Sequence, residues 1–483
     1  MVLKTGREYI ESLKSLRPII YYQGARIDDV ATHPLTRPHV RAAAMTYEIA
    51  REPEYKELAT AVSHLSGERI NRFTHIHQSK EDLISKVKLL RTIARRTGTC
   101  FQRCVGLDAL NAVYSVSFRV EAQTGIPYHQ RFLRFLRQVQ DEDMMLAGAM
   151  TDPKGDRSKS PGQQEDPDMF LRIVEKREEG VVIRGAKMHM TGMVNSQEML
   201  IMPTTALKKG EEEYAIACAI PIDAPGVYHI FGRQTNDQRK FGRMDQGNEA
   251  FGVVGGECLT VLEDVFVPWK RVFLCGEVEY AGQLVELFAS YHRQNYGGCK
   301  SGTADVIIGA AASLAEANGV EKAGHVKDKL TEMAHLTESL YCCAIACSCE
   351  GSCLDSGAWY VDPLLANVDK QNVTRSIYEI ARLSHDIAGG LIATMPTEED
   401  MTDPELGPVI RKYLKANSRY TPEERYQLAR LLENMTGGTA LVESMHGAGS
   451  PQAQRVVMAR QANLEEKKAW ARTLAGIRRE KDV

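Results

Sequence analysis

The sequence predicts an α+β fold built from three successive blocks. Up to residue 142, apolar residues recur three and four positions apart, which is typical of amphipathic helices. Strand-like segments separated by turn residues replace this spacing over residues 143–276, and helical spacing returns over 277–483. These patterns predict an N-terminal helical domain (1–142), a middle β-rich domain (143–276) and a C-terminal helical bundle (277–483).

The elements of each block follow from local patterns. Residues up to about 141 are expected to be all-helical, with the clearest spacing at 81–96 and 128–140. Segments 171–177 and 181–187 flank Glu178-Glu179-Gly180, which predicts a β-hairpin. Further strands are predicted at 199–204, 214–222, 226–231 and 260–267. Helices are predicted at 281–296, 304–317, 326–349, 363–387, 422–435 and 452–477.

Composition and charge exclude several classes of protein. The chain has 483 residues and a formal net charge of -3, which argues against a general binder of nucleic acids or anionic membranes. The N-terminal residues have no apolar signal core, and we find no apolar run long enough to span a bilayer. The 11 cysteines are unevenly placed, so thiols or metal ligands are favoured over disulfides. We expect a cytoplasmic protein without nucleic-acid or membrane partners.

Two separate segments carry residues that could bind a metal. Cys100 and Cys104 are four positions apart, and His292 and Cys299 are seven apart, so each pair would share one face of a helix. Gly297-Gly298 would leave room beside the second pair and would loosen a helix there. Three thiolates and one imidazole suit either a structural zinc or an iron–sulfur cluster, and spacing does not separate the two.

Simple packing is the alternative for these cysteines, because unpaired cysteines are among the most buried residues. Most of a second group lies in a predicted helix among small residues and has no nearby histidine. Bundle packing is the better explanation of that group, which comprises Cys342, Cys343, Cys347, Cys349 and Cys353.

Two loops and one tyrosine are further candidates. The segment from Thr151 to Arg157 has turn chemistry, but its basic side chains and amides could also face a pyrophosphate; taken alone, a turn is favoured. Glu443 and His446 precede a glycine-rich loop and could act as acid and base, although a loop that joins two helices is the default. Tyr296 is four residues after His292 and would face the same cavity.

The order of helical and β segments suggests an acyl-CoA dehydrogenase-like architecture. Several long motifs then carry a resemblance, at 100–106, 149–157, 291–294, 296–300 and 443–455. Along them, and along nearly the whole chain, the sequence resembles the 4-hydroxybutyryl-CoA dehydratases. These flavin and iron–sulfur enzymes are related to the 4-hydroxyphenylacetate 3-monooxygenase family. The resemblance implies the acyl-CoA dehydrogenase fold, an acyl-CoA substrate and a homotetramer.

The resemblance also implies two cofactors. It implies that Cys100, Cys104, His292 and Cys299 bind a 4Fe-4S cluster, and that FAD is held partly by the turn after residue 150. The cofactor-binding residues predicted on this basis are Gln102, Thr151, Asp152, Lys154, Gly155, Asp156, Arg157 and Thr191.

The activity that the resemblance implies is dehydration of 4-hydroxybutyryl-CoA to crotonyl-CoA, with vinylacetyl-CoA Δ-isomerase activity. A base takes the α proton, the flavin removes one electron, and the resulting enoxy radical makes the β proton acidic enough to leave. The cluster serves as a Lewis acid for the hydroxyl group, so oxygen sensitivity is expected.

Individual roles follow as expectations. They are His292 as ligand and possible base, Glu443 as a second acid or base, Tyr296 and Glu257 as hydrogen-bonding or proton-transfer groups, and Lys300 with Thr191 as tuning groups. Two rival functions remain: a flavin-dependent aromatic hydroxylase of the same superfamily, and a zinc-stabilised structural protein.

Overall fold

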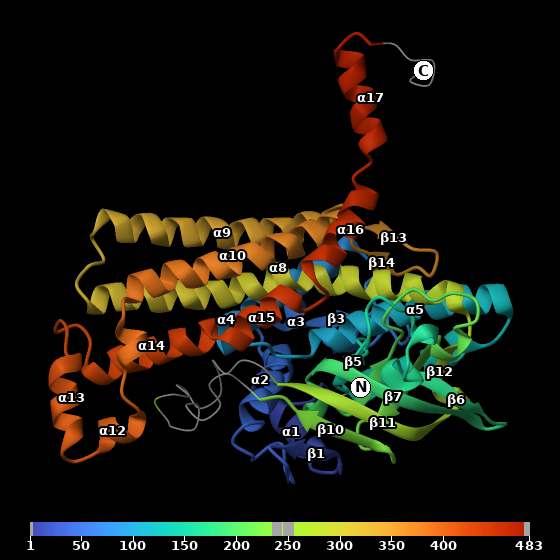
Figure 1. Cartoon of the computed structure of the whole chain (residues 1–483), viewed down its shortest axis with the longest axis horizontal. Helices are drawn as coiled ribbons and strands as arrows, with labels where there is room; N and C mark the ends of the chain where they lie inside the picture. Colours follow the sequence, from blue (N-terminus) through green and yellow to red (C-terminus); the bar gives the residue numbers. More distant parts are fainter. Residues whose placement is uncertain (1–2, 234–243, 245–255, 478–483) are drawn as a thin grey trace.

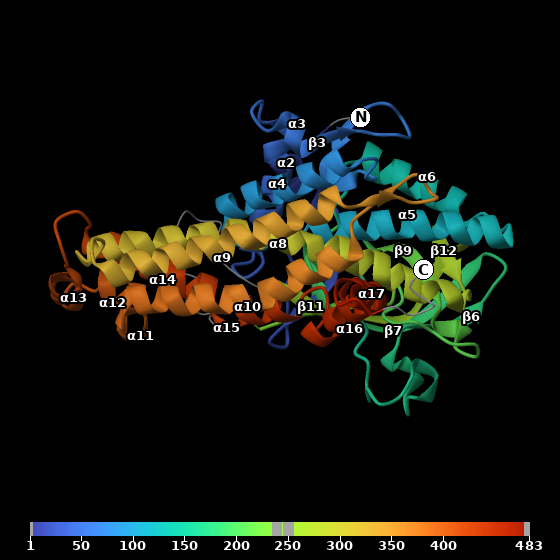
Figure 2. The same cartoon turned by 90° about the horizontal axis from the view of Figure 1, so that it is seen from above.

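The computed structural model describes residues 3–233, 244 and 256–477. Three long helices dominate it: α8 (Val278–Ala317), α9 (Gly324–Cys349) and α10 (Pro363–Ala388). They pack side by side as a layer, and the strands lie on one side of this layer (Figures 1 and 2). Helix α8 therefore faces other helices along much of its length and approaches the strand-rich part near its N-terminal half.

Most strands form two sheets. The first has six strands in the order β2-β1-β10-β11-β7-β6 and the second has four in the order β12-β9-β8-β5. The strands of the first sheet are β1 (Ile19–Tyr22), β2 (Ala25–Arg26), β6 (Arg172–Lys176), β7 (Gly180–Thr191), β10 (Val227–Phe231) and β11 (Glu257–Pro268). Those of the second are β5 (Leu146–Ala149), β8 (Glu198–Ile201), β9 (Ile216–Pro221) and β12 (Val272–Cys275).

The predicted hairpin is confirmed, because β6 pairs antiparallel with β7 and places Ile173 opposite Ile183. The four further predicted strands correspond to β8, β9, β10 and β11.

The prediction of an all-helical N-terminal block is wrong. Strand β1 pairs in parallel with β10, with Ile19 opposite Tyr228, so the N-terminal segment completes the larger sheet. The sequence of β1, Ile-Ile-Tyr-Tyr, has strong strand propensity. Gln23 and Gly24 follow with φ angles of 50° and 80°, the left-handed conformations of a tight hairpin turn. Strands β3 (Thr60–Val62) and β4 (Arg69–Asn71) form a separate pair in the same block.

The remaining helices surround these layers. The N-terminal ones are α1 (Gly6–Leu13), α2 (Arg37–Glu48), α3 (Lys56–Ala59), α4 (Lys80–Thr97), α5 (Cys104–Thr124) and α6 (Tyr128–Asp141). The C-terminal ones are α11 (Leu391–Thr394), α12 (Glu398–Thr402), α13 (Leu406–Leu414), α14 (Pro422–Thr436), α15 (Gly438–His446), α16 (Pro451–Gln461) and α17 (Leu464–Leu474). A short pair, β13 (Ser352–Cys353) and β14 (Trp359–Tyr360), links α9 to α10.

Helix α8 runs without interruption through Gly297 and Gly298, where the sequence predicted a loosened helix between two shorter ones. A Cβ atom on Gly298 would lie 2.8 Å from the Val87 carbonyl oxygen of α4, and one on Gly302 would lie 2.4 Å from the Arg91 carbonyl oxygen. A Cβ on Gly297 would meet Ala344 of α9 and Asp369 of α10. The glycines therefore make room for neighbouring helices.

Two hydrophobic cores meet along α8. The larger includes Tyr291 together with residues of the N-terminal helices and both sheets. The smaller begins at Tyr296 and includes residues of α9, α10 and α14. Side chains between these two positions lie at a junction, where polar groups can be buried without interrupting either core.

Helix α17 projects away from the other helices (Figure 1) and exposes Leu464, Trp470 and Leu474. Among the described residues, no helix is both long enough and apolar enough to cross a membrane.

Candidate functional site

Helix α8 carries four of the candidate residues near the junction of the two cores. Tyr296 is four residues after His292, and Cys299 and Lys300 are three and four residues after Tyr296, so these residues share one side of the helix. The interval from His292 to Tyr296 brings the two rings together, with centroids 5.6 Å apart. The two side chains therefore lie on one face of α8, as their spacing indicates.

Asp108 and Phe288 hold the His292 ring from two sides. Its Nδ1 atom lies 2.8 Å from Oδ2 of Asp108, a fully buried residue of α5. Phe288 stacks on the imidazole with centroids 5.5 Å apart and an interplanar angle of 18°. Because a carboxylate oxygen accepts hydrogen bonds, Nδ1 donates to Asp108 and Nε2 retains the lone pair that a metal would take.

Cys100 and Cys104 are not on one helix, contrary to the prediction. Helix α4 ends at Thr97 with Gly98 in the left-handed conformation, and Cys104 is the first residue of α5. Cys100 therefore lies in the connecting loop, which turns at Gln102 with a φ of 68°. A four-residue spacing predicts a shared helix face only if the intervening residues are helical, and here they form the connection.

The loop nevertheless brings Cys100, Cys104 and Cys299 close enough for their charges to interact. Burial raises the pKa of all three thiols, to about 12 for Cys299, and the neighbouring thiols raise it further for Cys100 and Cys104. Thiolates at these positions need a cationic partner. Three thiols and the Nε2 lone pair of His292 are a donor set that suits an iron–sulfur cluster.

Among the described residues, no group of three or more His, Cys, Asp or Glu side chains is arranged to hold a metal ion. A cubane cluster takes one ligand on each of four irons, so its ligands stand further apart than those of one ion.

Glu443 lies opposite α8 on α15 and connects two of the predicted residues. Tyr296 donates its hydroxyl hydrogen to Glu443 Oε1 at 3.1 Å, and Lys300 forms an ion pair with Oε2. Burial tends to raise the pKa of Glu443, but the Lys300 ammonium outweighs it and the pKa lies below its usual value. Glu443 is therefore a carboxylate at neutral pH. Gly447 is required here, because a Cβ there would lie 1.7 Å from the Tyr296 hydroxyl oxygen.

Lys370 belongs to this site but sequence reasoning missed it. It is fully buried on α10, donates to the Ser444 carbonyl oxygen at 2.5 Å, and lies 4.2 Å from the centroid of the Tyr296 ring. Burial lowers the pKa of Lys370 to about 7, although Glu443 opposes this shift. A lysine inside a predicted helix gives no sequence signal of burial, because most lysines are exposed.

Glu257 and Thr191 come together across adjacent strands, β11 and β7. Thr191 Oγ1 donates to Glu257 Oε2 at 2.6 Å. Burial raises the pKa of Glu257 to about 8, and the nearby Glu443 carboxylate raises it further while Thr191 and Lys300 oppose the shift. At neutral pH the site thus holds one protonated carboxyl group, Glu257, and one carboxylate, Glu443.

The segment after β5 contains both structural and unpaired charges. Asp152 is buried and forms an ion pair with Lys187 at 2.8 Å, so it fixes the loop and is not available to a ligand. Asp156 accepts from the backbone and side chain of Ser158 in an exposed turn. Lys154 and Arg157 form no ion pair with any residue between 3 and 477 that the structure describes. Burial lowers the pKa of His189, and the neighbouring Lys154, His446 and Arg157 side chains lower it further.

These basic groups therefore gather beside a segment whose Lys154 and Gly155 have φ angles of 73° and 46°. This is a local positive potential of the kind that suits an anion. A Cβ on Gly155 would lie 2.4 Å from Gln164 Oε1, so the chain approaches closely only because this position is glycine.

Gln102 faces the middle strands near Thr191. Its Oε1 atom is buried and has no hydrogen-bond partner within the described part of the chain, while its Nε2 lies 3.2 Å from His39 Nδ1. Gly192 lies next to this side chain, because a Cβ added at Gly192 would be 2.8 Å from Gln102 Cβ. An unpaired buried acceptor points to a donor supplied by a ligand or water.

The second cysteine group does not form one packed cluster. Cys347 is buried and donates to the Asp362 carbonyl oxygen, as bundle packing predicts. Cys342, Cys349 and Cys353 are exposed, and Cys353 lies in β13 rather than in a helix.

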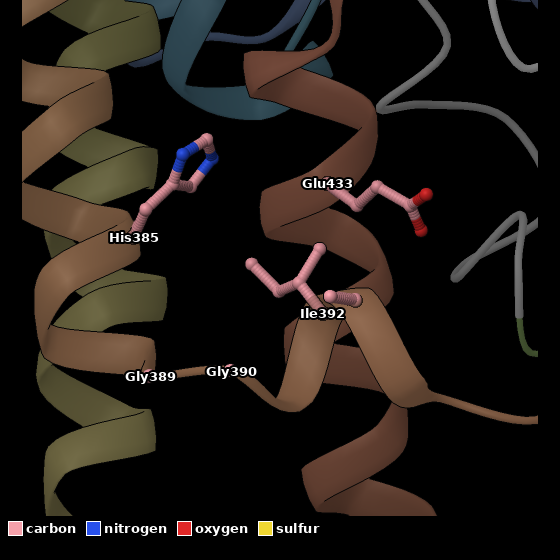
Figure 3. Close-up of a pocket in the computed structure, with 6 residues that line it drawn as sticks. His385, Gly389, Gly390, Ile392 and Glu433 are labelled. Atoms are coloured by element: carbon pink, nitrogen blue, oxygen red, sulfur yellow. The ribbon is translucent and has the colours of Figure 1, made fainter.

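A hollow at the far end of the bundle is separate from this site. Figure 3 shows it between α10, α11 and α14, lined by His385, Gly389, Gly390, Ile392, Ala393 and Glu433. His385 lies 15 residues after Lys370, or about 22 Å along α10 at 1.5 Å per residue. No candidate residue lines this hollow.

Two family models match the chain. The model of the 4-hydroxyphenylacetate 3-hydroxylase N-terminal part matches residues 5–274, and that of the C-terminal part matches residues 281–476. The chain therefore belongs to the 4-hydroxyphenylacetate 3-hydroxylase family.

Within this family the chain is similar to 4-hydroxybutyryl-CoA dehydratases. A 4-hydroxybutyryl-CoA dehydratase/vinylacetyl-CoA-Delta-isomerase of Clostridium aminobutyricum is 51% identical over 99% of this chain and 100% of that protein. The structure of an oxygen-tolerant archaeal 4-hydroxybutyryl-CoA dehydratase from N. maritimus has a TM-score of 0.96 and 47% identity, covering 99% of this chain and 96% of that chain. The resemblance seen in the sequence motifs is confirmed.

More distant structures define the fold. The oxygenase component of 4-hydroxyphenylacetate 3-monooxygenase, solved with FAD, has a TM-score of 0.86 and 26% identity, covering 98% of each chain. An acyl-CoA dehydrogenase from Slackia heliotrinireducens has a TM-score of 0.52 and 16% identity, covering 96% of this chain and 97% of that chain. The predicted mixed, acyl-CoA dehydrogenase-like architecture is confirmed at this level.

Proposed function

We propose that this protein dehydrates 4-hydroxybutyryl-CoA to crotonyl-CoA, has vinylacetyl-CoA Δ-isomerase activity, and carries FAD and a 4Fe-4S cluster. The observation that carries the proposal is the 51% identity to the Clostridium aminobutyricum enzyme along the whole chain. The donor set of Cys100, Cys104, Cys299 and the Nε2 side of His292 supports the cluster.

The chemistry explains why acid and base groups alone are insufficient. Loss of water removes a hydroxyl group from the γ carbon and a proton from the β carbon, which the thioester carbonyl does not acidify, and the net transfer of a proton from the α to the γ carbon gives crotonyl-CoA. When bound, FAD would supply reversible one-electron chemistry that acidifies this proton, and the cluster would supply a Lewis acid for the hydroxyl oxygen.

FAD binding is supported from two sides of the site. Lys154 and Arg157 suit the pyrophosphate, and Thr151 with Gly155 shapes the segment that carries them. Gln102 and Thr191 lie where they could contact the flavin ring. Asp152 and Asp156 would contribute to FAD binding only indirectly. Asp152 pairs with Lys187 and Asp156 accepts from Ser158, and both contacts hold the loop in its conformation.

The two glutamates are suited to opposite proton transfers. Glu443 is a carboxylate held by Lys300 and Tyr296, so it is assigned the role of a base. Glu257 keeps its proton to about pH 8 and is assigned the role of an acid or hydrogen-bond donor. Two titratable groups whose surroundings separate their pKa values are the usual mark of an acid and base pair.

The proposal includes a homotetramer. Helix α17 exposes Leu464, Trp470 and Leu474 on a projecting arm, and such apolar surface on a single chain supports burial against another copy.

The test is anaerobic purification followed by iron, sulfide and flavin analysis, a visible spectrum, and an assay of crotonyl-CoA formation from 4-hydroxybutyryl-CoA. We expect about four irons and one FAD per chain, together with water elimination that needs no added oxidant. Flavin without iron, together with oxygen-dependent hydroxylation of 4-hydroxyphenylacetate by added reduced flavin, would instead indicate an aromatic hydroxylase. Zinc without flavin would indicate the structural alternative.

A further inference from the structure

Asp108 lies beside His292, four residues after Cys104 on α5, and none of the proposed reaction steps uses it. We propose that Asp108 is a positioning residue that fixes the tautomer and orientation of His292, so that Nε2 is presented to the iron–sulfur cluster. This inference rests on the proposed function, in which His292 is a cluster ligand.

The hydrogen bond sets the tautomer. Asp108 Oδ2 lies 2.8 Å from His292 Nδ1, a distance typical of a strong bond between an imidazole N–H and a carboxylate. With the proton on Nδ1, the lone pair is on Nε2. Ligating histidines commonly donate their other N–H to a carboxylate, which orients the ring and makes the ligating nitrogen more basic.

Asp108 and the thiol of Cys104 are on the same helix, α5. Asp108 is four residues after Cys104 on the same helix, so both side chains point toward α8. A shift of α5 would therefore move one thiol and the histidine's partner together.

The carboxylate is itself held by other groups. Lys86 Nζ of α4 lies 3.3 Å from Asp108 Oδ1 and also 3.3 Å from the Tyr291 carbonyl oxygen. Asn295, one turn after His292, donates to Oδ2. Lys86 and Asp108 are both fully buried, so the pair connects α4, α5 and α8 without access to solvent.

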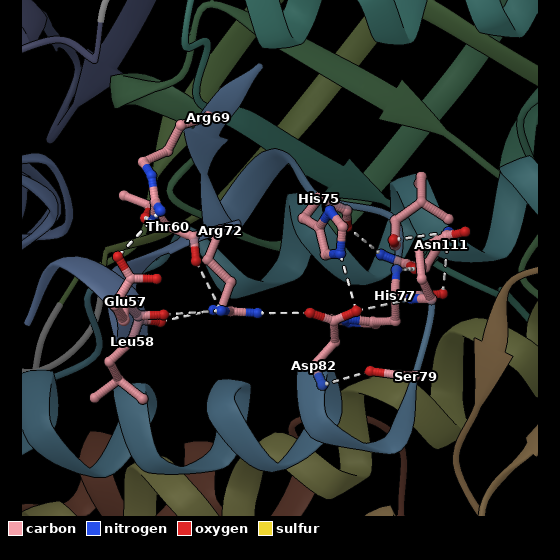
Figure 4. Close-up of polar contacts among 12 residues, drawn as sticks. Glu57, Leu58, Thr60, Arg69, Arg72, His75, His77, Ser79, Asp82 and Asn111 are labelled. Atoms are coloured by element: carbon pink, nitrogen blue, oxygen red, sulfur yellow. Dashed lines mark hydrogen bonds and ion pairs between the residues drawn. The ribbon is translucent and has the colours of Figure 1, made fainter. Parts of the chain in front are cut away.

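A second network fixes α5 one turn further on. Asn111 donates to the His75 carbonyl oxygen at 3.0 Å and accepts from the His77 amide at 2.9 Å. His75 in turn lies 3.0 Å from Asp82 of α4, which also pairs with Arg72 (Figure 4). The face of α5 that carries Asp108 and Asn111 is therefore tied to α4 at two successive positions.

The test compares Asp108→Asn with the wild-type holoenzyme, both purified anaerobically. An amide can still accept a hydrogen bond but is a weaker acceptor, and it places a donor against Lys86. We expect near-normal iron content, a changed quadrupole coupling of the remote imidazole nitrogen in pulsed EPR of the reduced cluster, and a higher reduction potential. The kcat should fall about 10- to 100-fold. KM should change little, because Asp108 is buried.

Two further variants separate positioning from general loss of stability. Glu198→Gln makes the same chemical change in another buried ion pair, Glu198 with Arg271 at 2.5 Å, which does not touch His292. It should leave the nitrogen signal and the potential unchanged. The double variant Lys86→Met with Asp108→Leu removes the acceptor without leaving an unpaired buried charge, and should reproduce the altered nitrogen signal even if Asp108→Asn does not fold.

The outcomes distinguish the two levels of the proposal. A wild-type protein without iron, or without a histidine nitrogen signal, would overturn the cluster assignment itself. A wild-type protein that shows both, with an unchanged nitrogen signal and potential in every folded Asp108 variant, would overturn only the positioning role.

Discussion

Replacing glycines of α8 by alanine tests the conclusion that they serve helix packing. Gly298 and Gly302 both face α4, where a Cβ would lie 2.8 Å and 2.4 Å from backbone carbonyl oxygens. Gly309 lies on the same helix, is exposed, and has nothing within 4 Å of the Cβ position. It is therefore a matched control for the same substitution.

The expected magnitudes follow from two opposing effects. Glycine to alanine in a helix gains about 1 kcal/mol from propensity. Ordinary contacts begin at 3.4 Å, so α4 and α8 would have to separate by 0.6 Å at Gly298 and by 1.0 Å at Gly302. Overpacking of this kind costs about 1–3 kcal/mol. Gly309→Ala should therefore be more stable than the wild type by about 1 kcal/mol, and Gly298→Ala less stable by up to about 2 kcal/mol.

Scanning calorimetry of the anaerobic holoenzyme measures this order. At about 2.1 cal/mol/K per residue, 1 kcal/mol corresponds to about 1 °C in a chain of 483 residues. We expect Tm to decrease in the order Gly309→Ala, wild type, Gly298→Ala, Gly302→Ala. Equal or higher Tm values for Gly298→Ala and Gly302→Ala would refute the packing explanation.

The remaining predictions concern the site. Cys104→Ala should lose iron and abolish dehydration, and unchanged iron and turnover would remove it from the ligand set. His292→Cys should keep a cluster more readily than activity; full activity would contradict the Lewis-acid role. Glu257→Gln should gain stability over the wild type as pH rises from 4.5 to 8, by at most about 1.4 kcal/mol per unit, because the native pKa of about 8 disfavours ionisation; a pH-independent difference in urea midpoints would contradict this. Exposure to air should bleach and inactivate the protein. Colour and activity that persist in air would contradict this and would instead resemble the oxygen tolerance of the archaeal relative.

Local pattern predicted most of the regular elements, because their periodicity depends on neighbours in sequence. The β6–β7 hairpin carries its turn between two strand-like segments, and the long C-terminal helices have extended apolar spacing. Strand β1 was missed although its residues favour a strand, since the helical spacing around it dominated the block. Its partner, β10, is more than 200 residues away, so pairing could not be read locally.

The site was predicted unevenly for the same reason. Tyr296 and Lys300 were found because they share a helix face with His292 and Cys299. Asp108 and Lys370 reach the site from α5 and α10, and their residue types alone do not indicate burial. The four-residue spacing of Cys100 and Cys104 predicted one shared helix, but Cys100 lies in the α4–α5 loop. This loop brings Cys100 to the site through a left-handed turn at Gln102 that a four-residue spacing does not encode.

The location of the site explains how one fold can support different chemistry. Most candidate residues lie at the junction of two hydrophobic cores, and only a few of them, such as Cys104 and Tyr296, also belong to a core, so most substitutions among them leave both cores intact. A TM-score of 0.86 at only 26% identity to the monooxygenase component is consistent with cores that keep their shape while other positions diverge. The α4–α8 contact is different, because Gly298 and Gly302 fix the distance between the helix that carries His292 and Cys299 and the helix that leads into Cys100. Chemistry at this junction can therefore change by side-chain substitution, but only on a backbone whose helix spacing is retained.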